Sequence, residues 1–260
     1  MGTCESPQRV AICIGGGVRT FTDPAVYTSV GRNLIGSFAN GSLGDTAVVF
    51  TSLKLSDTMG RASALNNKLS SVKSQATEGD VHTVLHWLAQ ANPHAHIVPP
   101  KLSQNLSAYD MARCGDLPRH WTAMTCLWPM ALSRHHEQAV LAQLETRYWC
   151  GEAMKSWLES HRDMPPFDWL LITRPDILFH SPVTRACLWD AKDISFTTTV
   201  APDSTFVLPA VDFESLGSGW RDWQQCKDLT DLGYTMRPER VLQEKFKKSL
   251  LHVPHEQVSV

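Results

Sequence analysis

The chain has 260 residues, 43% of them hydrophobic and 19% charged, a composition that allows a sizeable buried core and excludes a disordered chain. Its net charge of −2 gives no overall field that would attract nucleic acid, so we expect no nucleic-acid partner. No apolar stretch reaches the roughly 20 residues of a membrane helix, and we expect no membrane span.

The first fifty residues predict a βαβ unit. Val10–Ile14 is a short apolar run that ends in glycines, typical of a buried strand that leads into a turn where backbones pass closely. Asp23 followed by Pro24 predicts the start of a helix. Its apolar positions at helical spacing are Val26, Val30, Leu34 and Phe38. Thr46–Thr51 predicts a second buried strand, parallel to the first.

The remaining chain alternates polar, helical and apolar segments. Arg61–Gly79 is polar and predicts a surface loop or a loose helix. Helices are predicted at 81–90, 121–144, 148–161 and 238–248, and strands at 96–98, 170–172, 194–200 and 205–208. His82 and His86 lie one helical turn apart, but no third ligand stands near them in sequence, so a solvated helix face is favoured over a metal site.

Seven cysteines occur without a C-x-x-C pair, which excludes zinc-ribbon and thioredoxin-type sites. Several stand in apolar runs and favour buried thiols in a reducing compartment over a disulfide framework. The N-terminus lacks the layout of a signal peptide, so we expect a cytoplasmic protein. Two glycosylation sequons, Asn40-Gly41-Ser42 and Asn105-Leu106-Ser107, point instead to a Golgi or secretory origin, which applies if the chain is a truncated form.

The run LLITRPDILF, residues 170–179, sets charged residues into an apolar strand pattern. Ligands of open α/β sheets sit beyond the carboxyl ends of the strands, so Arg174 and Asp176 are expected to emerge there, aimed by Pro175. Burying these charges without partners costs several kcal/mol, so they either pair with each other as a structural ion pair or face a polar ligand.

Four motifs stand out along the chain: Gly16-Gly17-Val18-Arg19-Thr20-Phe21, Phe167-Asp168-Trp169 through Thr173-Arg174-Pro175-Asp176, Asp203–Leu208 and Pro238–Leu242. They resemble motifs of poorly characterised glycosyltransferase-like proteins of the GT-A fold. They span nearly the whole chain in the expected order. The chain departs from the pattern at Ile172, where such proteins have an earlier arginine, and at Arg174, which replaces the first carboxylate of the Asp-x-Asp motif.

The resemblance implies a GT-A-like α/β/α sandwich around a mostly parallel mixed sheet. It implies transfer of a sugar from a nucleotide-sugar donor to an unknown glycan, protein or small-molecule acceptor. The residues that it assigns to the donor diphosphate are Gly16, Gly17, Arg19 and Arg174. Asp176 would hold Mn²⁺ or Mg²⁺, although Arg174 leaves metal dependence open. Asp203 is favoured as the catalytic base over Asp212 and Glu214.

One domain over 1–260 is expected, with a nucleotide-binding half at about 8–110 and an acceptor half at about 165–260. The main alternative is a Rossmann-type enzyme that uses NAD or S-adenosylmethionine. Against it, Thr20 stands where the third glycine of G-x-G-x-x-G belongs, and Phe50-Thr51-Ser52 offers no acid for a ribose. A further alternative is a non-catalytic nucleotide-sugar-binding module.

Overall fold

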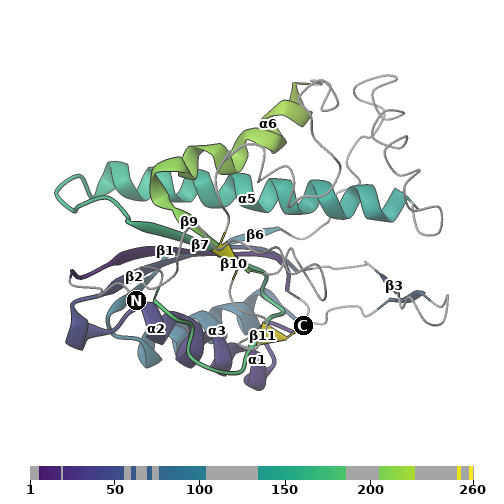
Figure 1. Cartoon of the computed structure of the whole chain (residues 1–260). Coiled ribbons are helices and arrows are strands. Elements are labelled where there is room, and N and C mark those ends of the chain that lie inside the picture. The colour runs from purple at the N-terminus through teal and green to yellow at the C-terminus, as the bar shows by residue number, and fades with distance from the viewer. Residues whose placement is uncertain are drawn as a thin grey trace.

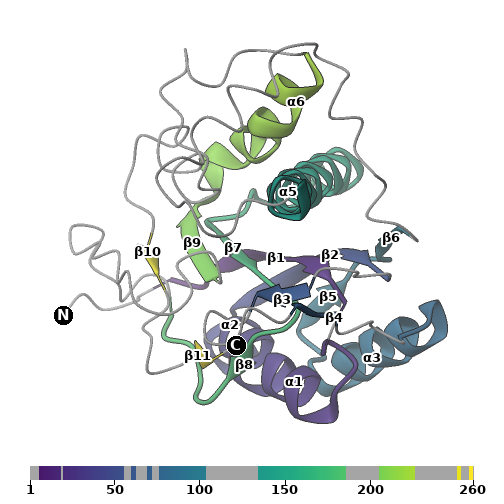
Figure 2. The ribbon, with the colours of Figure 1, turned by 90° about the vertical axis from the view of Figure 1, so that its right-hand side faces the viewer.

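An open β-sheet lies between two layers of helices (Figures 1 and 2). The computed structural model describes residues 6–18, 20–55, 60–62, 69–71, 76–103, 134–185, 205–225, 251–252 and 258–259. The strands of the sheet are β1 (Arg9–Gly17), β2 (Thr46–Lys54), β5 (Ala95–Ile97), β6 (Lys101–Ser103), β7 (Trp169–Thr173), β9 (Thr205–Pro209) and β10 (Leu251–His252). Their order is β10-β9-β7-β1-β2-β5, and β6 also pairs with β2.

Most neighbours in this sheet run in the same direction. β1 is parallel to β2 on one side and to β7 on the other, and β2 is parallel to β5 and β6. β9 is antiparallel to β7, and β10 is antiparallel to β9. The prediction of an α/β fold with a mostly parallel mixed sheet is therefore confirmed.

Helical segments cover both faces of the sheet. One layer holds α1 (Pro24–Ser29), the π-helical η1 (Val30–Ile35), α2 (Gly36–Phe38) and α3 (Glu78–Ala91). The other holds α5 (Arg134–Ser160), the 3₁₀ segment η5 (Ala210–Gly217) and α6 (Ser218–Gln224). A short 3₁₀ turn, η2 (Gly41–Leu43), precedes β2. Two small ribbons pair β3 (Gly60–Ala62) with β4 (Leu69–Ser71), and β8 (Leu178–Phe179) with β11 (Val258–Ser259).

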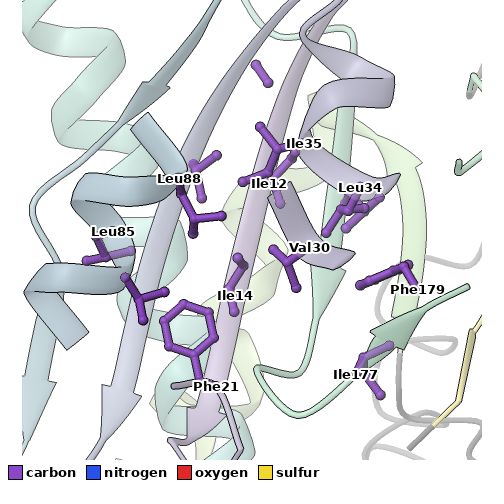
Figure 3. Packing of buried hydrophobic residues seen from close by; sticks show 14 of the residues in the cluster. Ile12, Ile14, Phe21, Val30, Leu34, Ile35, Leu85, Leu88, Ile177 and Phe179 are labelled. Carbon is purple, nitrogen blue, oxygen red and sulfur yellow. The ribbon is translucent and has the colours of Figure 1, made fainter. Parts of the chain in front are cut away.

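The helix layer of α1 and α3 packs on alternate side chains of the strands. Ile12 and Ile14 of β1 point toward Val30 and Leu88 of this layer (Figure 3). All four side chains are fully buried, which is worth about 1.5–3 kcal/mol for each. Because successive strand residues face opposite sides, the intervening Cys13 points to the α5 face. This alternation explains why the apolar run of β1 is continuous.

Side-chain hydrogen bonds cap the N-termini of α1 and α3 in this layer. The Asp23 carboxylate accepts a hydrogen bond from Ala25 N at 2.8 Å, and Pro24 takes the first helical position, as predicted. Thr77 and Asp80 form a reciprocal capping box at the start of α3. The cap lowers the pKa of Asp80, first through the hydrogen bond from the Thr77 backbone and then through that from its side chain.

α5 is one continuous helix where the sequence predicted two. The predicted helices at 121–144 and 148–161 meet in a single element, Arg134–Ser160, and residues 121–133 lie outside the described residues. The helix packs on β1 and β2 through Cys150 and Met154, both buried. The polar triplet that misled the prediction, Glu145-Thr146-Arg147, therefore lies within the helix.

A disulfide joins Cys13 of β1 to Cys150 of α5, with a Cα–Cα distance of 5.9 Å. Both residues are buried, as expected, but the prediction of buried free thiols is wrong for this pair. The sequence could not reveal the pairing because 137 positions separate the two cysteines. The other cysteines, Cys4, Cys114, Cys126, Cys187 and Cys226, lie outside the described residues.

The segment after β7 crosses to the α1 layer and is fastened there. Phe179 N donates to Ser29 Oγ at 3.1 Å, and Asn33 Nδ2 donates to Phe179 O at 2.6 Å. Arg185 ends the segment with an ion pair to the buried Asp45 at 2.7 Å. The chain that leaves β7 is therefore held against the first βαβ unit.

Several helices and strands begin or end at other residues than predicted. β1 continues through Gly17 and β2 through Lys54, so each strand ends three residues later than predicted. Parts of the predicted loop at 61–79 pair as β3 and β4. The predicted strand at 194–200 and helix at 238–248 lie outside the described residues. Within the described ranges, no helix is both long enough and apolar enough to cross a membrane.

Candidate functional site

The carboxyl ends of the parallel strands β1, β2 and β7 meet at one edge of the sheet. β1 connects to β2 on one side through the α1 layer, whereas β7 lies on its other side. A ligand crevice forms in such sheets where neighbouring connections diverge. The antiparallel β9 begins at the same edge, where Thr205 Oγ1 lies 2.8 Å from Thr173 Oγ1. The candidate site is therefore the end of β1 and β7.

The glycines at the end of β1 allow close approach from both sides. Gly16 has φ +141°, and a Cβ built there would lie 3.2 Å from Cδ of Pro175. A Cβ on Gly15 would lie 3.2 Å from Cβ of Thr146 on α5. The glycines continue the strand instead of forming the predicted turn, since Gly17 pairs in register with Lys54. The close neighbours of these glycines are side chains of Pro175 and Thr146, so the predicted close approach of backbones stays a prediction.

Arg174 and Asp176 pair with each other around Pro175. Arg174 Nε donates to Asp176 Oδ1 at 2.9 Å, and its Nη2 donates to Oδ2 at 2.6 Å. The Asp176 side chain is 8% exposed and that of Arg174 is 21% exposed. The two-pronged contact explains how a strand with an apolar pattern tolerates both charges. It also leaves the guanidinium partly open at the sheet edge.

Asp168, from the aromatic-Asp-Trp motif, ties the start of β7 to β1. Its carboxylate accepts a hydrogen bond from Arg9 N at 2.8 Å, and its own N donates to Arg9 O at 2.9 Å. Phe167 is buried beneath the Arg9 guanidinium, which lies 5.0 Å from the ring centroid. These contacts fix the start of β7 against β1, in the register that brings Pro175 against Gly16.

Three residues at this edge escaped the sequence analysis. Lys54, buried at the end of β2, forms an ion pair with Glu145 of α5. Arg147, on the same helix, is 5% exposed. A lysine at the end of an apolar strand was a readable signal for Lys54. Arg147 gave no signal, because an arginine in a polar triplet of a helix is normally solvated.

Arg147 and Arg174 line one small hollow beside Gly15. The hollow has room for about 20 Å³, roughly that of one water molecule. Its lining is completed by Cys13, Gln143, Thr146, Ile172 and Thr173. Ligand pockets of drug-like size run from about 300 to 1,000 Å³, so the hollow marks at most a corner of a ligand site. Two of its lining residues are arginines, a residue type well suited to phosphate oxygens, and Arg174 is already paired with Asp176.

Two predicted site residues, Arg19 and Asp203, lie outside the described residues. Their roles as phosphate ligand and catalytic base stay predictions. Asp212 and Glu214, the alternative bases, lie in η5, but their side chains are not described. Of the predicted donor-binding residues, Gly16 and Arg174 flank Pro175, and Gly17 follows in the strand.

The predicted metal ligand Asp176 is paired with an arginine in this structure. Both carboxylate oxygens of Asp176 accept hydrogen bonds from Arg174, whose positive charge opposes a cation at the same carboxylate. Across the described ranges, no group of three His, Cys, Asp or Glu side chains is placed to hold a metal ion. His82 Nε2 instead lies 3.7 Å from Glu78 Oε1, and His86 Nε2 lies 2.9 Å from Gln90 Nε2. Metal binding at Asp176 stays a prediction.

Comparison with known proteins gave no relative. No model of a known protein family matches the chain, and no curated protein matches it. The geometry at the ends of β1 and β7 is therefore the ground for any functional conclusion.

Proposed function

We propose that this protein is a glycosyltransferase that uses a nucleotide-sugar donor. The observation that supports the proposal is that two arginines, Arg147 and Arg174, line the same hollow as Gly15 where β1 and β7 end. A nucleotide sugar presents a diphosphate, and its departure concentrates negative charge on the phosphate oxygens. Fixed cations at a sheet edge stabilise that charge without reorganisation.

The strand arrangement supports a donor site of the GT-A type. The parallel strands β7, β1, β2, β5 and β6 and the two strands beyond β7, of which β9 is antiparallel to it, make a mixed sheet, and a donor would bind at the ends of β1 and β7. The Arg-Pro-Asp turn follows β7 directly. By the resemblance, this turn corresponds to the acidic motif of that fold. The first half of the sheet would then bind the nucleotide and β9 would face the acceptor.

In the proposed reaction, the acceptor hydroxyl oxygen attacks the anomeric carbon of the donor sugar. A new C–O bond forms, the C–O bond to the diphosphate breaks, and its electron pair leaves with the nucleoside diphosphate. A base takes the hydroxyl proton, and Asp203 is the proposed residue. Arg147 and Arg174 bind the leaving diphosphate in place of a metal ion, so the reaction proceeds with donor charge neutralised by the protein.

The Rossmann alternative gains no support from the longer β2. Dinucleotide enzymes hold a ribose with an acid near the end of the second strand. Here β2 ends in Lys54, whose ammonium group pairs with Glu145. A non-catalytic module would share the same pocket, so only turnover separates it from a transferase.

Thermal unfolding with added ligands tests the proposal. UDP-sugars and GDP-sugars are added with and without Mn²⁺, and NAD and S-adenosylmethionine serve as the competing ligands. A ligand at 100 times its Kd adds about 2.7 kcal/mol, or about 5–10 °C for a protein of this size. We expect a shift with a sugar nucleotide that persists without Mn²⁺ and is lost in Arg147→Met. A shift with NAD or S-adenosylmethionine alone rejects the proposal.

Turnover is measured with the sugar nucleotide that gives the shift. Release of nucleoside diphosphate, followed over time with a panel of glycan, peptide and small-molecule acceptors, identifies a transferase. Binding without release under any acceptor assigns the chain to the non-catalytic class.

A further inference from the structure

The turn that precedes β2 carries the sequon Asn40-Gly41-Ser42 at the protein surface. Asn40 is half-buried, and the three residues of η2 that follow it are exposed. Leu43 in this turn is 45% exposed, one of two exposed large hydrophobic side chains among the described residues. An Asn-x-Ser sequence is an acceptor for N-linked glycosylation when it lies on an accessible surface of a secretory protein.

The side chain of Asn40 is oriented by its own turn. Its Oδ1 accepts hydrogen bonds from Ser42 N at 3.1 Å and from Ser42 Oγ at 2.7 Å. Both bonds use the carbonyl oxygen of the amide. Within the described part of the chain, Asn40 Nδ2 donates no hydrogen bond, so the nitrogen that would carry a glycan is available.

The disulfide between Cys13 and Cys150 is a second, independent observation. Disulfides persist in the oxidising lumen of the secretory pathway and are rare in the cytosol, where thiols are kept reduced. N-linked glycosylation takes place in that same lumen. A buried disulfide across 137 positions and an accessible sequon therefore point to one compartment.

The sequon also lies away from the candidate site. η2 leads into Thr46, which pairs with Arg9 at the amino end of β1. Gly16 and Arg174 lie at the opposite end of the strands. A glycan on Asn40 would cover the exposed Leu43 and leave the site open.

We propose that Asn40 carries an N-linked glycan and that the protein folds in an oxidising secretory compartment. The co-reactant is a lipid-linked oligosaccharide diphosphate. The amide nitrogen of Asn40 forms a bond to the anomeric carbon and loses one proton, while the C–O bond to the diphosphate breaks and its electron pair leaves with the phosphate. The proposal is independent of the proposed transferase activity.

Peptide mapping of the full-length protein from its own cells tests the proposal. The protein is captured with an antibody and digested before and after treatment with peptide N-glycosidase. We expect the peptide containing Asn40 to appear as a glycopeptide, and after enzymatic release to appear with aspartate at position 40. An unmodified Asn40 peptide, or a glycan on Asn105 alone, overturns the proposal.

Two variants expressed through a eukaryotic secretory pathway separate glycosylation from folding. Asn40→Asp keeps an oxygen that accepts from Ser42 but removes the acceptor nitrogen, so the glycosidase-sensitive mobility shift is expected to disappear. Ser42→Thr keeps both the hydroxyl and the sequon, so the shift is expected to remain. Retention of the full shift in Asn40→Asp also overturns the proposal.

Discussion

Gly16 and Pro175 lie so close together that a Cβ on the glycine would stand 3.2 Å from the proline Cδ. The contact joins the end of β1 to the turn that holds Arg174 and Asp176. The proline thus has two roles: it shapes the turn between the paired charges, and its ring packs against the neighbouring strand where only glycine leaves room.

Gly16→Ala is expected to destabilise the protein by about 1–3 kcal/mol, because φ +141° is unfavourable for alanine and the added methyl group crowds Pro175. Displacement of the Arg-Pro-Asp turn is expected to weaken sugar-nucleotide binding. Urea unfolding and ligand-induced thermal shifts measure the two effects. Gly79→Ala is the control, since its Cβ would meet only Thr77 Oγ1 at 3.7 Å near a helix start. Equal stability of the two variants would contradict the contact.

Asp176→Asn removes the charge that holds Arg174 while it preserves the shape of the side chain. We expect a loss of about 1–3 kcal/mol in the free energy of unfolding, less than for a fully buried pair because Arg174 is 21% exposed. Asp176→Ala is expected to abolish the proposed transfer. Asp163→Asn, an exposed carboxylate, should change the stability by less than about 0.5 kcal/mol. Undiminished transfer in Asp176→Ala would remove this residue from the mechanism.

Reduction of the Cys13–Cys150 disulfide is expected to lower the stability by up to about 5 kcal/mol, because the bridge closes a very long loop in the unfolded chain. Thermal unfolding with and without dithiothreitol measures the effect. The double variant Cys13→Ala/Cys150→Ala should unfold at the lower temperature under both conditions. An equal response of wild type and double variant to the reductant would place the effect at other cysteines.

A lower pH is expected to reduce the free energy of unfolding through protonation of His96. Burial lowers the pKa of His96 below 6.5, and the neighbouring His161 lowers it further. The unfolded chain therefore binds a proton on His96 at a higher pH than the folded protein does, and the free energy of unfolding falls as the pH drops below about 6.5. Because much of the ring is exposed, we expect roughly 0.5 kcal/mol or less.

His96→Phe isolates this effect. The His96 ring lies 4.3 Å from the Trp157 ring between centroids, and phenylalanine retains that contact without a titrating group. Urea unfolding of both proteins at pH 7.5 and pH 5.5 should show a smaller loss for the variant. The same loss in both would assign the pH dependence to other groups.

Local signals in the sequence were sufficient for much of the fold. The sequence predicted β1, the start of α1, β2 and β7 because short apolar runs, a Pro-containing helix cap and glycines determine the local backbone structure. The charged island of Arg174 and Asp176 was recognisable for the same reason, since charges inside an apolar run demand partners. The sequence left an ion pair and a polar ligand open as explanations, and the coordinates show the ion pair.

The failures lie where distant segments meet. The polar triplet Glu145-Thr146-Arg147 broke the apolar pattern of α5 and was interpreted as a helix boundary. Thr146 and Arg147 are buried there because the helix passes the candidate site. Likewise, the partners Lys54 and Glu145 are 91 positions apart. Patterns that conflict with a secondary-structure period occur at functional sites because the side chains serve the site instead of the core.

The pairing of β7 with β1 joins segments far apart in the chain: Arg9 and Asp168 are 159 positions apart. During synthesis, a nascent chain that has emerged from the ribosome only as far as α5 still lacks β7, so one edge of β1 has unpaired backbone hydrogen-bonding groups. Contacts so distant in sequence form slowly, and unpaired margins invite association with other chains. Truncation before β7 should therefore yield aggregating fragments, and protection by chaperones matters most before the last third emerges.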